Sequence, residues 1–77
     1  PSVSIQINGH SDNTGNKLKN QKISEERARI VFEYLISKGV QNKMEFKGFG
    51  GSFPLTANDT EEGKAKNRRV EFEILQN

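Results

Sequence analysis

Three short stretches of the chain alternate apolar and polar residues, and only one long stretch has the spacing of an amphipathic helix. The alternating stretches cover residues 3–8, 43–47 and 69–74, and this period is typical of a strand buried on one face. A strand, a helix and a second strand predict a parallel pair joined by a right-handed crossover. The sequence therefore predicts an α+β fold with a mixed sheet, in which a third, C-terminal strand joins the parallel pair.

The long helix is expected to begin at Ser24, after a polar loop from Gly9 to Lys22. Ser24 is a favourable N-cap residue, and the two glutamates that follow it suit the positive end of the helix dipole. Gly39 is expected to end this helix, and Thr60 to cap a shorter one. The apolar stripe at helical spacing consists of Ala28, Val31, Phe32, Leu35 and Ile36.

One long helix is too little cover for three strands that each present an apolar face. With 77 residues and 31% hydrophobic side chains, the chain is one small domain with a thin core. The uncovered strand would expose an apolar patch of a size that soluble monomers rarely show. We expect either a second copy to cover it, as a homo-oligomer or domain swap, or a preceding strand and helix of the same domain.

Composition excludes several classes of site. The chain has no cysteine and one histidine, which rules out a disulfide framework and a metal site with thiolate or several histidine ligands. We expect no cofactor. The net charge of +2 is mild, and glutamates dilute the basic cluster of residues 64–69, so no nucleic-acid partner is predicted.

The polar segment after the first strand, Gly9 to Asn16, suggests two further chemistries that the spacing excludes. His10, Ser11 and Asp12 are consecutive, whereas the members of a catalytic triad come from separate segments and converge on one atom. A calcium loop of the EF-hand type that started at Asp12 would need glutamate at its twelfth position, which is Ile23. The sequence therefore predicts neither an enzyme nor a calcium site.

Several short motifs follow one another along the chain. They are Gly9-His10-Ser11-Asp12, Asn20 before Ile23-Ser24 and Arg27-Ala28, Gly48-Phe49-Gly50 with Pro54, and Asn67-Arg68-Arg69-Val70-Glu71. Their order and intervals resemble the OmpA-like C-terminal domain, a family that includes peptidoglycan-associated lipoproteins and the wall-anchoring domain of flagellar stators. The resemblance extends from Val3 to Ile74. The family domain begins with one more strand and helix, which implies that residues 1–77 are a single, N-terminally truncated OmpA-like domain.

The resemblance implies non-catalytic binding of peptidoglycan through the diaminopimelate of its stem peptide. It assigns Asp12 to the ammonium group of the ligand and Arg27 to its carboxylate, with Asn20 and Arg68 as supporting contacts. The chemistry suits these residues, because diaminopimelate ends in a cation beside an anion and the planar arginine fork can donate two parallel bonds to a carboxylate. Lys19 stands where the family commonly has an aromatic residue. The implied location is the periplasmic side of an outer-membrane or envelope-anchored protein.

Arg27 also stands out from the residues alone. A capping box that began at Ser24 would have glutamate or glutamine at this position, and a cation in the first turn opposes the helix dipole. An external carboxylate at that turn would offset this cost. Taken singly, Asp12 is typical of a turn, Arg27 of a solvated helix face, and Arg68 of a cross-strand ion pair. The alternative function is a structural oligomerisation or interaction domain without a ligand.

Overall fold

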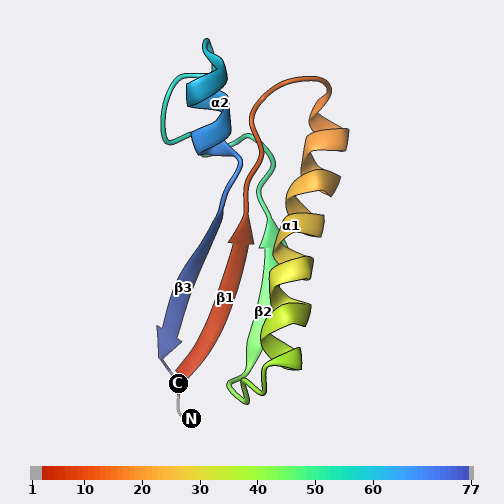
Figure 1. Ribbon diagram of the computed structural model, residues 1–77, viewed down its shortest axis with the longest axis vertical. Helices are drawn as coiled ribbons and strands as arrows, with labels where there is room; N and C mark the ends of the chain where they lie inside the picture. The colour runs from red at the N-terminus through yellow and green to blue at the C-terminus, as the bar shows by residue number, and fades with distance from the viewer. Residues whose placement is uncertain (1–2, 77) are drawn as a thin grey trace.

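The computed structural model describes residues 3–76, which form a three-stranded sheet and two helices. In chain order the elements are β1 (Val3–Gly9), α1 (Lys17–Ser37), β2 (Met44–Gly48), α2 (Glu61–Asn67) and β3 (Val70–Gln76). The strand order is β2-β1-β3, with β1 parallel to β2 and antiparallel to β3. Figure 1 shows α1 lying along one side of the sheet and α2 beyond one end of it. The predicted α+β fold with a mixed sheet is confirmed.

The predicted start of the long helix was wrong. α1 begins at Lys17, and the Asn16 side chain is its N-cap, accepting a hydrogen bond from the backbone N–H of Lys19 at 2.7 Å. Ser24 is not a cap but a fully buried residue two turns inside the helix. Arg27 therefore lies about three turns from the N-terminus, where the helix dipole has little effect. The dipole argument for a carboxylate at Arg27 does not hold.

The other predicted helix signals are confirmed. Gly39 follows the C-cap of α1 with φ +87°, a conformation that glycine adopts without strain. Its N–H donates to the carbonyl of Ile36 at 3.0 Å. Thr60 caps α2, because its hydroxyl accepts a hydrogen bond from the N–H of Gly63 at 3.0 Å.

The apolar side chains of all three strands lie on the face that α1 partly covers. Ile7 pairs with Phe72 across β1 and β3, so the two side chains share one face. Ile7 and Ala28 of α1 are fully buried, whereas Phe72 and Ile74 are 55% and 59% exposed, because α1 packs on β1 and β2. The expected uncovered patch is present on β3. Ile36, predicted to face the core, is instead 52% exposed.

The opposite face of β1 is also more buried than simple alternation predicts. Ser4 and Gln6 are each only 8% exposed, although both were expected to face solvent. β1 is the central strand, and its neighbours place Glu45 and Glu73 on either side of Gln6. Gln6 is thus flanked on both sides by long side chains of the edge strands.

Candidate functional site

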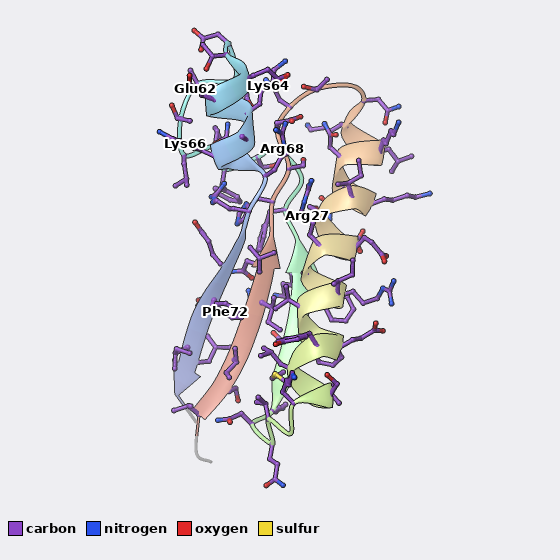
Figure 2. The ribbon with its side chains drawn as sticks, viewed as in Figure 1. Arg27, Glu62, Lys64, Lys66, Arg68 and Phe72 are labelled. Atoms are coloured by element: carbon purple, nitrogen blue, oxygen red, sulfur yellow. The ribbon has the colours of Figure 1, made fainter. Side chains whose placement is uncertain are left out.

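The four residues singled out from the sequence come from three segments that meet at one end of the sheet. Asp12 follows the C-terminal end of β1, Asn20 and Arg27 lie on α1, and Arg68 connects α2 to β3. Figure 2 labels Arg27 and Arg68, which reach this end of the sheet from α1 and from the segment after α2. All four residues line one open cavity of about 260 Å³.

Two strand-end glycines allow α1 to lie unusually close to the sheet beside this cavity. A Cβ atom added to Gly9 would be 2.0 Å from the backbone oxygen of Ser24, and one added to Gly48 would be 2.5 Å from the backbone nitrogen of Glu25. No side chain fits in either place. This close approach is what places Asn20 and Arg27 over the ends of the strands.

The loop after β2 joins the helix to the segment that carries Asp12. The Ser24 hydroxyl accepts a hydrogen bond from the N–H of Gly50 and donates one to the Gln21 carbonyl, both at 2.8 Å. The carbonyl of Gly50 in turn accepts the N–H of Ser11 at 2.9 Å. Ser24 can therefore be buried, because its hydroxyl group has hydrogen-bond partners in the loop and in the helix. One network of hydrogen bonds thus sets the position of Asp12 relative to α1.

Asp12 is held as a charged carboxylate. One oxygen accepts the backbone N–H of Thr14 at 2.9 Å, and the other accepts Nη1 of Arg68 at 2.7 Å. The hydrogen bond from Thr14, followed by the Arg68 guanidinium, lowers the pKa of Asp12 below its ordinary value of 3.8, against the opposing effect of burial. Asp12 is therefore ionised at neutral pH, although its side chain is only 12% exposed.

Arg68 is positioned by the residue before it. Asn67 is fully buried, and its side-chain amide both accepts hydrogen bonds from the loop between β2 and α2 and donates hydrogen bonds to it. Its oxygen accepts the N–H groups of Leu55 and Thr56, and its nitrogen donates to the Thr56 carbonyl and to the side chain of Asn58. This arrangement fixes the end of α2, and so the point from which Arg68 reaches Asp12.

Arg27 and Asn20 retain hydrogen-bonding capacity on the cavity side. Nη1 of Arg27 donates to the backbone carbonyl of His10 at 3.3 Å, which uses one of the five donors of the guanidinium. Asn20 is 7% exposed, and within residues 3–76 its side chain makes no hydrogen bond. An amide that lines the cavity and makes no such bond is suited to binding a ligand.

The cavity also contains residues that sequence reasoning did not assign to the site. They are Ser11, Thr14, Gly15, Lys19 and Ile23. Lys19, Ile23 and Arg27 follow one another at intervals of four residues, so they share a face of α1. The sequence would have revealed this face if the helix had been started at Asn16 instead of Ser24.

His10 lies behind the cavity rather than in it. The residue is 4% exposed, and its ring stacks on Phe49 at a centroid distance of 5.6 Å and forms a T-shaped pair with Phe53. The Ser11 hydroxyl donates to the carbonyl of Asp12, so these neighbours do not form a triad. Within residues 3–76, no group of three or more histidine, cysteine or acidic side chains could hold a metal ion.

Comparison with known proteins places this arrangement in a family. The family model described as "OmpA family" matches residues 1–68. The chain belongs to the OmpA family. The peptidoglycan-binding protein ArfA of Mycobacterium tuberculosis is 43% identical over 75 residues, which are 96% of the chain and 23% of ArfA. Outer membrane protein A of Bordetella avium is 46% identical over 68 residues, 87% of the chain and 35% of that protein.

A solved structure shares the fold of this OmpA-family chain. The peptidoglycan-associated lipoprotein of Burkholderia pseudomallei superposes with a TM-score of 0.91 at 29% identity, over 96% of the chain and 64% of the lipoprotein chain. The OmpA-family chain spans a quarter to a third of the curated relatives it matches. Within residues 3–76, neither helix has the length and apolar character needed to cross a membrane.

Proposed function

We propose that this chain binds peptidoglycan without cleaving it, by holding the amino-acid end of diaminopimelate in the stem peptide. The observation that carries the proposal is the convergence of an ionised Asp12 and a largely unpaired Arg27 in one cavity. A carboxylate has about four lone-pair sites, and the carboxylate of Asp12 uses two of them for Thr14 and Arg68. The remaining sites can accept an ammonium group while Arg27 donates to the adjacent carboxylate.

The size and lining of the cavity support a small, doubly charged ligand. Its volume of about 260 Å³ is at the lower limit of the roughly 300–1,000 Å³ that is typical of small-molecule sites. That space suits the end of one amino acid better than a sugar chain. Asn20 would hydrogen-bond the same end of the ligand, and Arg68 would hold the Asp12 carboxylate in place.

The relatives support the same function by name. ArfA is called a peptidoglycan-binding protein, and the structural neighbour is called a peptidoglycan-associated lipoprotein. Neither name refers to an enzymatic activity, which supports a binding role rather than catalysis. We therefore propose that the chain faces the periplasm as part of an outer-membrane or envelope protein, and tethers that protein to the cell wall.

The test is an NMR titration of the chain with two stem peptides, one containing diaminopimelate and the other lysine, which lacks the second amino-acid end. We expect saturable shifts near Asp12, Asn20 and Arg27 with the first peptide only. Asp12→Asn or Arg27→Gln should weaken binding at least about tenfold, since a hydrogen bond to a charged group contributes roughly 1.5–3 kcal/mol.

Matched controls separate the site from a general loss of charge. Asp59 is exposed in the loop before α2, and Arg29 lies on the outer side of α1, where it pairs with Glu26 and Glu33. Asp59→Asn and Arg29→Gln should bind like the wild type. If the Asp12 and Arg27 variants bind as tightly as these controls, the assignment of the site is refuted. If neither peptide shifts any NMR signal of the wild type, the proposed function is refuted.

Self-association is a second candidate function, which the exposed patch of Phe72 and Ile74 favours. A second copy that covered this face would bury apolar surface beside the fully buried Ile7. Sedimentation of the wild type and of a Phe72→Ser variant tests this candidate directly. A dimer that the variant abolishes, together with no binding of the peptide, would favour an interaction domain over a wall anchor.

A further inference from the structure

The cavity has more cationic than anionic residues, and a zwitterionic amino-acid end does not change that balance. Three cationic residues line it, Lys19, Arg27 and Arg68, against one acidic residue, Asp12. Arg68 and Asp12 neutralise each other through their ion pair at 2.7 Å. A bound amino-acid end adds one ammonium and one carboxylate, which leaves the total unchanged. After Arg27 has taken the carboxylate, Lys19, which also lines the cavity, has no ion-pair partner within residues 3–76.

Folding does not account for a cation at Lys19. It is the third residue of α1, where the dipole favours acidic side chains, yet the first turn contains no acidic residue. Its backbone N–H is held by Asn16 at 2.7 Å, so the start of its side chain is fixed. Within the described part of the chain, its ammonium group forms no ion pair. The ammonium therefore adds to the positive potential at the N-terminus of α1.

We propose that Lys19 binds a second carboxylate of the ligand, outside the amino-acid end held by Asp12 and Arg27. The proposal rests on the proposed function and extends it from the recognition of diaminopimelate alone to the recognition of a class of stem peptides. The site then selects stem peptides that carry a further free carboxylate near diaminopimelate, and it disfavours peptides in which that carboxylate is a carboxamide. Amidation changes the charge of the ligand while its shape stays nearly the same, so the discrimination is electrostatic.

The experiment compares three peptides, each containing alanine, glutamate and diaminopimelate. One has all its carboxylates free, one has the glutamate α-carboxylate amidated, and one has the chain-terminal carboxylate amidated. Wild-type protein should bind the free peptide about two- to fivefold more tightly than one of the amidated peptides, the range expected for a solvent-exposed charge pair. Raising the salt concentration should shrink the difference.

Lys19→Gln should bind the free peptide and that amidated peptide with equal affinity. Lys17→Gln is the matched control, because Lys17 lies in the same turn of α1 but does not line this cavity. It should keep the wild-type preference. If Lys19→Gln also keeps the preference, or if the wild type shows none with either amidated peptide, the inference is wrong.

The two failures are distinguishable. If the wild type binds all three peptides equally and Asp12→Asn still weakens each of them, the proposed function holds and only the role of Lys19 is refuted. If the wild type binds none of the peptides, the proposed function itself fails.

Discussion

The ion pair between Asp12 and Arg68 joins the candidate site to the fold, and a double-mutant cycle should measure its strength. Asp12→Asn removes the charge but keeps the oxygen that accepts the N–H of Thr14. Arg68→Gln removes the guanidinium that donates to the other oxygen. The coupling is the difference between the double variant and the sum of the single variants in free energy of unfolding.

The exposure of the two side chains sets the expected coupling. Exposed ion pairs contribute about 0.2–1 kcal/mol, and hydrogen bonds to charged groups with less solvent contribute roughly 1.5–3 kcal/mol. The side chain of Asp12 is 12% exposed and that of Arg68 is 36% exposed. Solvent on the arginine side screens the pair, so the lower part of this span applies, and we expect a coupling of about 1 kcal/mol.

Urea unfolding of the four proteins at pH 7 provides the free energies. The coupling should be present at pH values above 3.8, the ordinary pKa of Asp12, and it should be lost as the pH falls through the lowered pKa of the folded state. The exposed pair of Arg29 and Glu33 on α1 is a suitable comparison cycle, and its coupling should be smaller. If the effects of the Asp12 and Arg68 single variants add up to that of the double variant within about 0.3–0.5 kcal/mol, the reasoning is refuted.

Two further predictions concern stability. Gly9→Ala should lower the free energy of unfolding by about 1–3 kcal/mol or more, because its Cβ would meet the Ser24 backbone oxygen at 2.0 Å; an unchanged melting temperature would contradict the close packing of α1. His10, the sole histidine, has a pKa lowered below 6.5 by burial and, secondarily, by Arg69, against the attraction of Glu71. As the pH falls, His10 is therefore protonated in the unfolded chain before it is protonated in the folded chain, so the free energy of unfolding should decrease below pH 6.5. Urea titrations of His10→Phe should show a weaker dependence of this free energy on pH.

Local signals in the sequence were reliable where a single residue type determines the geometry. Gly39 ends α1 with a positive φ that other residues rarely adopt, and Thr60 caps α2 with its own hydroxyl. Both depend on neighbours within four residues. The strand periods likewise placed β1, β2 and β3, because a half-buried sheet requires alternation along each strand.

The start of α1 was misplaced because its first two turns bury polar side chains. Asn20 and Ser24 are 7% and 0% exposed, so the buried face of the helix carries no apolar period there. Ser24 is satisfied by the N–H of Gly50, 26 residues away, and this partner is visible only in the folded chain. A hydrophobic pattern cannot reveal a face whose burial depends on hydrogen bonds to a distant loop.

By itself the sequence determined the strand–helix–strand order, the mixed sheet and the family, and the family resemblance implied the four residues proposed for the candidate site. These follow from short-range periodicity and from motifs with fixed spacing. Only the tertiary structure decided that Asp12 pairs with Arg68, 56 residues away, and that Lys19 belongs to the same cavity as Arg27. The physical reason is that the strength and partner of a charge depend on distance and burial in three dimensions, and neither can be read from separation along the chain.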